Sequence, residues 1–298
     1  MIEPNNENNN YSKSWAGIKI SSCNVSSLNL SLAHVDDENN TFRKKMSSIL
    51  KHGSDIFLLQ DTRVSNKLHI LTNYINCTQW GNFNIFSNSS MNRRGVVTLI
   101  NKRSNIEVIE QINSEDENCL ILKLRKGDSA IVVANVYGPT QQEFPNIFND
   151  LKTTLNRFVN IPIVISGDLN AISDTTKPVN CRDTSNNDLI GTVNIPNLRN
   201  SKLIEQWNKD GTFYDVFRLK NPNVKEYSYV SFNVASTQRS RIDLTLANEK
   251  ALKFIKKTEY IFQPRFFDHK MQIIRLTIPE QSAPRPDMNN LDLTGMNE

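Results

Sequence analysis

The chain alternates short runs of β-branched and other apolar residues with segments in which apolar residues recur at a helical period. The short runs predict strands, because each is bounded after a few positions by polar or turn-forming residues. These runs are GIKISSCN, DIFLLQD, GVVTLINK, CLILKLRK, AIVVANVYG, IPIVISGDLN, YSYVSF, RIDLTLA and MQIIRLTI.

The segments with a helical period are 41–52, 143–159, 201–209 and 249–257. In the first of them the apolar residues share one face, and Gly53 supplies the stop. Few helices among many strands predict two mixed sheets packed face to face with helices outside, and not a doubly wound sheet. The absence of G-x-G-x-x-G and G-K-[ST] motifs leaves nucleotide-cradling chemistry without support.

Composition indicates one globular domain over residues 15–279, since 38% of residues are hydrophobic and 22% are charged. The Asn-rich residues 1–14 are expected to be disordered, and residues 280–298 read as a linker to a further domain. The polar stretch from Asp174 to Asn200 is longer than a usual connection, so a functional loop and an insertion without a role are both open.

Charge and cysteine usage narrow the function classes only slightly. A net charge of +4 suits a polyanionic partner, although ordinary surface lysines explain it equally well. The four cysteines are far apart, which argues against a zinc site or a disulfide framework. No run approaches the roughly 20 apolar residues of a membrane span, so no membrane partner is expected.

Several apolar strands end in a polar residue that a strand interior disfavours. Taken singly, each is more simply a turn former or a helix cap. Strands that run the same way across packed sheets would bring such residues to one rim, where the late residues Asp243 and His269 can join them. The strand-end residues are Asn24, Asp61, Tyr137, Asp168 and Asn170.

These residue types are the parts that a metal-dependent phosphodiesterase requires. Asp61 and Asn24 offer the oxygen ligands that Mg²⁺ prefers. Asp168 can deprotonate an attacking water whose lone pairs Asn170 orients. His269 can donate to a phosphate oxygen, and Asp243 on its other ring nitrogen would hold the tautomer.

The ordered motifs GIKISSCNVSSL, DIFLLQDTR, RRGVVTLINK, VVANVYGPT, VISGDLNA, SRIDLTLA and FDHKMQIIRL resemble the exonuclease III-like endonuclease/exonuclease/phosphatase superfamily. The closest similarity is to the endonuclease domains of LINE-type (non-LTR) retrotransposons, over about Gly17 to Ile278. The resemblance implies a four-layered α/β sandwich and dependence on Mg²⁺ or Mn²⁺. It also implies nicking of double-stranded genomic DNA in the nucleus, leaving a 3′-hydroxyl from which a reverse transcriptase domain primes.

Carried over by position, the family's metal and phosphate residues include the strand-end set above, together with Asp243 and His269. The resemblance adds Ser228 as a phosphate-contacting hydroxyl and Asp268 as a metal or histidine partner. The stretch from Ser231 to Arg241 resembles the family's DNA-facing hairpin, in which Arg239 and Arg241 would contact phosphates or remain exposed arginines without a role.

Two positions depart from the family pattern. Asp61 stands where the family carries glutamate, which shortens a metal ligand by one methylene. Phe267 stands where a small serine precedes the Asp-His pair, and a bulky ring there would restrict the substrate or reshape the pocket.

Three alternatives to retrotransposon-type nicking stay open on sequence alone. One is repair of abasic sites, although AISDTTKPVN after GDLN lacks the repair-type continuation. The second is a phosphatase of small molecules or phospholipids, which the same core can support. The third is a protein that binds DNA without cutting it.

Overall fold

The structure is a computed structural model, and it describes residues 17–30, 40–79, 82–89, 93–139, 146–175, 183–184, 197–230, 239–264 and 267–277. The expected terminal tails lie outside these residues, as do most of the stretch after Asp174 and residues 231–238 of the expected hairpin.

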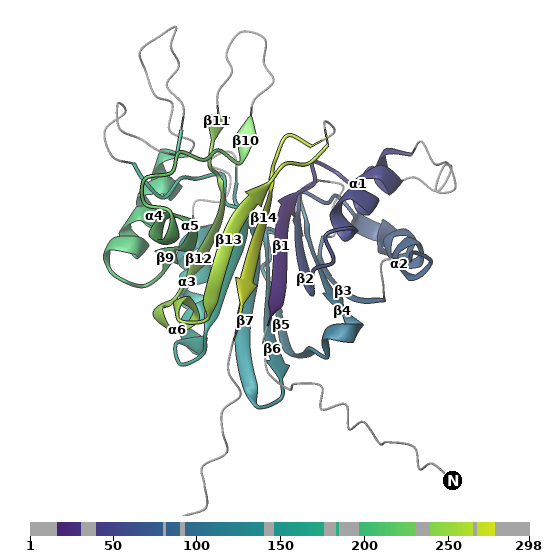
Figure 1. Cartoon of the computed structure of the whole chain (residues 1–298), viewed down its shortest axis with the longest axis horizontal. Helices are drawn as coiled ribbons and strands as arrows, with labels where there is room; N and C mark the ends of the chain where they lie inside the picture. Colours follow the sequence, from purple (N-terminus) through teal and green to yellow (C-terminus); the bar gives the residue numbers. More distant parts are fainter. Residues whose placement is uncertain are drawn as a thin grey trace, which may run out of the picture.

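Two six-stranded mixed sheets form the centre of the molecule (Figure 1). The first has the order β13-β14-β1-β2-β4-β3 and the second the order β5-β6-β7-β8-β12-β9, while β10 and β11 form a separate ribbon. The strands of the first sheet are β1 (Ile18–Asn24), β2 (Ile56–Gln60), β3 (Phe83–Asn88), β4 (Val96–Asn101), β13 (Ile255–Ile261) and β14 (Met271–Leu276). Those of the second are β5 (Glu107–Asn113), β6 (Cys119–Lys126), β7 (Ser129–Tyr137), β8 (Ile163–Asp168), β9 (Tyr214–Asp215) and β12 (Asp243–Ala247). The ribbon consists of β10 (Tyr229–Val230) and β11 (Arg239–Ser240).

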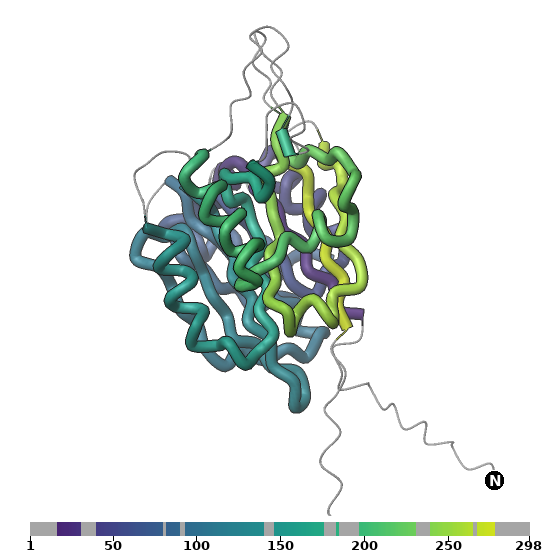
Figure 2. The backbone as a smooth tube through the Cα atoms, turned by 90° about the vertical axis from the view of Figure 1, so that its left-hand side faces the viewer, coloured from purple at the N-terminus to yellow at the C-terminus, as the bar shows by residue number. Residues whose placement is uncertain are grey.

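Helices cover the outer faces of both sheets, as Figures 1 and 2 show. Apolar residues of α1 and α2 pack on the first sheet, and those of α3 and α4 pack on the second. This arrangement confirms the expected four-layered α/β sandwich. No helix among the described residues is long and apolar enough to cross a membrane. The helices are α1 (Thr41–Leu50), α2 (Leu68–Asn76), α3 (Ile147–Leu155), α4 (Leu198–Lys209), α5 (Val216–Lys220) and α6 (Glu249–Leu252).

The core between the sheets is apolar, with a polar layer across it. Ile20, Leu58 and Val133 are among the fully or almost fully buried residues that join the two sheets. The buried Asn135 side chain of β7 accepts a hydrogen bond from Gln60 Nε2 at 2.7 Å, and its own amide donates to carbonyl oxygens of the facing sheet. Buried polar groups need such partners, so this layer fixes how the two sheets align.

Some predicted elements differ from the structure. The helix expected over 249–257 ends at Leu252, because Ile255 begins β13 and pairs with β14. The strands β3 and β5 were not predicted, and both lie at sheet edges, where only one face is covered. Trp207 is buried against Phe148 and Phe213, so it packs in the core under the second sheet.

Strand register places the polar strand ends at one level. The parallel pair β7 and β8 sets Tyr137 opposite Asp168, and the antiparallel pair β8 and β12 sets Asp243 opposite the same residue. In the first sheet, parallel pairing of β1 with β2 sets Asn24 opposite Gln60, directly before Asp61. Residues distant in sequence therefore meet at one end of the sandwich.

Candidate active site

The two sheets are joined at this end by a direct side-chain contact. Asn24, the last residue of β1, donates from Nδ2 to Asp168 Oδ2 at 2.7 Å, and both side chains are buried. Asn24 Oδ1 in turn accepts from the backbone N–H of Ser26 at 2.8 Å. The amide is thus held at both ends, so it orients the carboxylate that ends β8.

Asp168 is held through both of its carboxylate oxygens. Its Oδ1 accepts the backbone N–H of Asn170 at 2.9 Å, while Oδ2 faces Asn24. Burial raises the pKa of Asp168 to about 7; the charge of His269 opposes this rise and that of Asp243 adds to it. A carboxyl group with a pKa near neutrality is suited to accept and release a proton.

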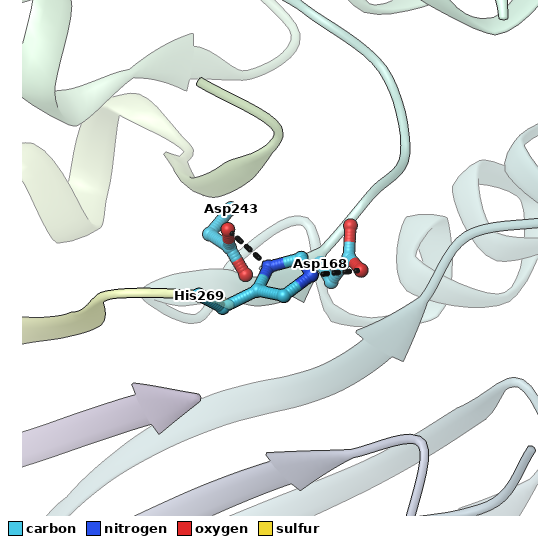
Figure 3. Close-up of side chains that lie close together, drawn as sticks. All are labelled: Asp168, Asp243 and His269. Atoms are coloured by element: carbon cyan, nitrogen blue, oxygen red, sulfur yellow. Dashed lines mark hydrogen bonds and ion pairs between the residues drawn. The ribbon is translucent and has the colours of Figure 1, made fainter. Parts of the chain in front are cut away.

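His269 and Asp243 form a hydrogen-bonded pair beside Asp168 (Figure 3). Nδ1 of the imidazole lies 2.8 Å from Asp243 Oδ2, and Nε2 lies 3.8 Å from Asp168 Oδ2. Burial alone lowers the pKa of His269, but the attraction of Asp243 and Asp168 outweighs it and raises the pKa to about 9. The Tyr229 ring packs against the imidazole with centroids 4.9 Å apart.

Backbone contacts hold Asp243 in place. The buried Ser228 hydroxyl accepts the N–H groups of Ile242 and Asp243 at 3.1 and 3.0 Å. Tyr260 donates its hydroxyl to the Asp243 carbonyl oxygen at 2.5 Å. Ser228 is only 1% exposed and holds the backbone of Asp243, and its contact with a phosphate stays a prediction.

Asn170 is positioned by a close crossing of two chain segments. Its Nδ2 donates to the Gly138 carbonyl oxygen at 2.8 Å, and the Gly138 N–H donates to the Asp168 carbonyl oxygen at 2.7 Å. A Cβ atom at position 138 would overlap the carbonyl group of Leu169. Glycine is therefore required for the segments after β7 and β8 to approach this closely.

Gly138→Ala is expected to displace Asn170 and Asp168 and to destabilise the fold by about 1–3 kcal/mol, the usual range for forced overlap. Phosphodiesterase activity should fall further than the loss of folded protein explains, because the displaced groups belong to the site. Urea unfolding and activity measured on the same preparations test this. Gly53→Ala is the control, since nothing lies within 4 Å of its added Cβ and only its left-handed backbone opposes the change. Unchanged activity of folded Gly138→Ala would contradict the prediction.

Asp61 lies directly after β2 and is paired with Arg63. Both carboxylate oxygens accept from the guanidinium group, Oδ1 from Nε at 3.0 Å and Oδ2 from Nη2 at 2.9 Å. The side chain of Asp61 is 8% exposed and that of Arg63 is 47% exposed. Sequence analysis did not single out Arg63, and its spacing of two residues from Asp61 was the available signal.

The loop after β1 connects Asp268 to the site. Ser26 donates its hydroxyl to Asp268 Oδ1 at 2.6 Å. The almost fully buried Lys45 of α1 donates from Nζ to the carbonyl oxygens of Val25 and Ser27 at 2.5 and 2.8 Å. Lys45 was not predicted, since a lysine on an amphipathic helix usually faces solvent.

Tyr137 ends β7 and is paired with Asp168 of β8. Burial raises the pKa of Tyr137 above its ordinary value, and the charges of Asp61 and Asp168 add to this. The phenol therefore stays protonated at neutral pH and remains a hydrogen-bond donor.

The donor set fits a divalent cation. The ligand atoms of Asp168, Asp243 and His269 lie within 4.8 Å of one another. Asp243 Oδ1 is buried and has no hydrogen-bond partner within the described part of the chain, a costly state that a cation would relieve. Because the surrounding donors are mostly carboxylate and amide oxygens, they suit a hard cation such as Mg²⁺.

Arg241 and Phe267 differ from what the sequence predicted. Arg241 is fully buried and its guanidinium is enclosed by Asp183 and Asp215, so it cannot contact DNA phosphates in this conformation. Phe267 is buried in the core that includes α1, with the Lys45 ammonium 5.7 Å from its ring centroid. The ring therefore packs inward among the apolar residues of that core. Arg239 is exposed on β11, so phosphate contact stays a prediction there.

Comparisons with known proteins place this geometry among known folds. No protein-family model matches the sequence. An uncharacterized 149 kDa protein of transposon TX1 from Xenopus laevis is 23% identical over 257 residues, which cover 84% of this chain and 18% of that protein. The chain therefore spans less than a fifth of that relative.

Solved structures share the fold at low sequence identity. An AP endonuclease from Leishmania major matches with a TM-score of 0.66 and 14% identity, covering 89% of each chain. An AP endonuclease from Archaeoglobus fulgidus matches at 0.62 and 18%, covering 87% of this chain and 99% of that one. The endonuclease domain of TRAS1, a telomere-specific non-LTR retrotransposon, matches at 0.57 and 12%, covering 87% and 98%. These structures show that the chain has the fold of AP endonucleases and of a non-LTR retrotransposon endonuclease domain, and the transposon relative supports the resemblance to such domains that the sequence motifs indicated.

Proposed function

We propose that this chain is a Mg²⁺-dependent DNA endonuclease that nicks double-stranded DNA and leaves a 3′-hydroxyl. The observation that carries the proposal is the convergence of Asn24, Asp168, Asp243 and His269 at one end of the sandwich, within hydrogen-bond or ion-pair distance of one another. The fold shared with two AP endonucleases and a retrotransposon endonuclease domain supports it.

Asp168 is the proposed general base. Its two oxygens are oriented by Asn24 and by the backbone of Asn170. A water held near this carboxylate would lose its proton to Asp168 as its oxygen attacks phosphorus, and the bond from phosphorus to the 3′-oxygen of the DNA would break on the opposite side. Asp168 would transfer the proton to solvent after each turnover.

A 3′-hydroxyl product requires that the 3′-oxygen be the leaving group and that this oxygen gain a proton. The proton that it gains must come from a nearby donor or from solvent. Protonated Tyr137, which is near enough to Asp61 and Asp168 for their charges to raise its pKa, is the proposed donor. His269, fixed through Nδ1 by Asp243, presents Nε2–H to a nonbridging phosphate oxygen.

The residues that would hold the metal ion are Asp61, Asp268 and Asn24, with the carboxylates of Asp168 and Asp243 alongside. When bound, Mg²⁺ supplies positive charge that offsets the charge developing on the phosphate and the leaving oxygen. His269 is left for phosphate because its Nδ1 is already engaged by Asp243 and Mg²⁺ prefers oxygen donors.

Nicking of supercoiled plasmid in the presence of Mg²⁺ tests the proposed function. We expect open-circular product with Mg²⁺ or Mn²⁺, none after chelation by EDTA, and recovery when the metal is restored. Extension of the nick by a DNA polymerase without prior end repair checks for the 3′-hydroxyl. Metal-independent nicking, or ends that a polymerase cannot extend, would contradict the proposal.

The biological setting follows from the transposon relative as a further proposal. In a longer polypeptide, the nick would prime a reverse transcriptase domain on genomic DNA, and the proposed activity would then lie in the nucleus. Synthesis of complementary DNA would be measured with a longer polypeptide and with its His269→Ala variant. Loss of synthesis in the variant would show that synthesis depends on the nick.

Repair of abasic sites is the second candidate, because two of the similar solved structures are AP endonucleases. The same plasmid assay, run beside an oligonucleotide duplex with one abasic site, separates the candidates. A strong preference for the abasic duplex would favour repair.

A further inference from the structure

The pairing of Asp61 with Arg63 has a consequence for the metal that the proposed site requires. Asp61 is a metal ligand in the proposed site, yet each of its oxygens already accepts from the Arg63 guanidinium group. Two parallel hydrogen bonds to one carboxylate form the strongest geometry that arginine offers. A divalent cation and this guanidinium therefore require the same negative charge.

The backbone around this pair is held on both sides. Asp61 O and Thr62 O accept N–H groups from Ser27 and Leu28 of the loop after β1. On the other side, the N–H groups of Thr62 and Arg63 donate to Gly95 O and Arg94 O at the start of β4. Asp61 consequently cannot leave by a shift of its loop without breaking several hydrogen bonds. The Arg63 side chain is the part that can move.

Exposure shows in which direction it can move. The Arg63 side chain is 47% exposed while that of Asp61 is 8% exposed, so the guanidinium lies at the solvent side of the carboxylate. The same arginine lies near Tyr137, another residue of the proposed site. The guanidinium group is therefore the part of the pair that a phosphate arriving from solvent can reach.

We propose that Arg63 is a latch on the metal site: it competes with the divalent cation for Asp61, and a phosphate of bound DNA releases it. This inference rests on the proposed function. A phosphate can accept two parallel hydrogen bonds from a guanidinium group, as a carboxylate does. Contact of Arg63 with DNA would therefore free Asp61 for the cation. Metal and DNA would then each raise the affinity for the other, as linkage requires.

Metal binding measured without DNA tests the first half of the proposal. Free Mn²⁺ is quantified by electron paramagnetic resonance during titration of the wild-type chain, Arg63→Ala and Asp61→Asn. We expect Arg63→Ala to bind Mn²⁺ about three- to tenfold more tightly, the range of an exposed ion pair and of a modest coupling. If Arg63 only positions Asp61 for the metal, Arg63→Ala binds more weakly, and the latch is excluded.

The control must remove one positive charge without touching the site. Arg125 is a half-exposed arginine paired with Glu107. It lies near the end of β6 that is farther from Tyr137. Arg125→Ala should leave Mn²⁺ affinity unchanged. An equal gain in Arg125→Ala and Arg63→Ala would assign the effect to net charge and overturn the proposal.

Metal titration with DNA present tests the second half. A short duplex is added in a His269→Ala background, which prevents cleavage, with and without Arg63→Ala. The duplex should tighten Mn²⁺ binding when Arg63 is present and do so less when it is replaced; equal tightening in both would exclude release by phosphate. Failure of the wild-type chain and of every variant to bind Mn²⁺ would instead count against the proposed function itself.

Discussion

Asp168→Asn is expected to lower the rate of plasmid nicking by about 100- to 10,000-fold, the usual contribution of a positioned general base. The amide is nearly the same size but cannot accept the proton of the attacking water. Its NH₂ group would also face the amide of Asn24, which now donates to Asp168 Oδ2 at 2.7 Å. Initial rates under single-turnover conditions measure the chemical step directly.

The control for this variant is Asp128→Asn. Asp128 lies in the turn between β6 and β7, at the end of these strands that is farther from Tyr137. This substitution removes the same charge and should retain wild-type nicking. Circular dichroism and thermal unfolding should show that Asp168→Asn is folded. Nicking by folded Asp168→Asn within tenfold of the wild type would remove Asp168 from its proposed role.

Arg241→Met is expected to lower the free energy of unfolding by about 3–5 kcal/mol, the cost of breaking a buried charge pair from one side. Arg241 donates to Asp183 at 2.9 Å through both Nε and Nη2, and Nη2 also donates to Asp215 at 2.5 Å. None of the three side chains is more than 1% exposed. Methionine fills much of the volume but leaves two buried carboxylates without this partner.

Urea unfolding of Arg241→Met and of Arg125→Ala shows whether the loss of stability comes from the burial of the arginine or from the loss of its charge. Arg125 is 52% exposed, so its loss should cost less than about 1 kcal/mol. Similar losses in the two variants would show that the Arg241 cluster contributes no more than a surface pair.

The same cluster should stabilise the fold in a pH-dependent way. Burial alone raises the pKa of Asp183, but Arg241 and Arg218 lower it below its ordinary value. Its contribution to stability is therefore present above the ordinary aspartate pKa and is lost as the pH falls through the lowered value. In Arg241→Met, this acid-side loss of stability should be smaller.

The apolar pattern predicted most strands, and physical reasons explain where it failed. Edge strands such as β5 bury only one face, so their apolar signal is weak. The residues from Ile255 follow the short helix α6 and continue its helical period in the sequence, but they pair with β14 as a strand. Long-range pairing of this kind leaves no local signal.

By itself, the sequence determined which polar residues follow which apolar runs, and this was enough to name Asn24, Asp168 and His269 as one candidate site. Only the tertiary structure decided their contacts, because Asn24 and Asp168 are 144 residues apart and meet through the packing of two sheets. It also decided that Arg241 is enclosed by carboxylates and that Arg63 pairs with Asp61. Periodicity reports whether a residue faces a core or solvent, whereas a charged side chain takes its partner from whatever the fold brings within reach.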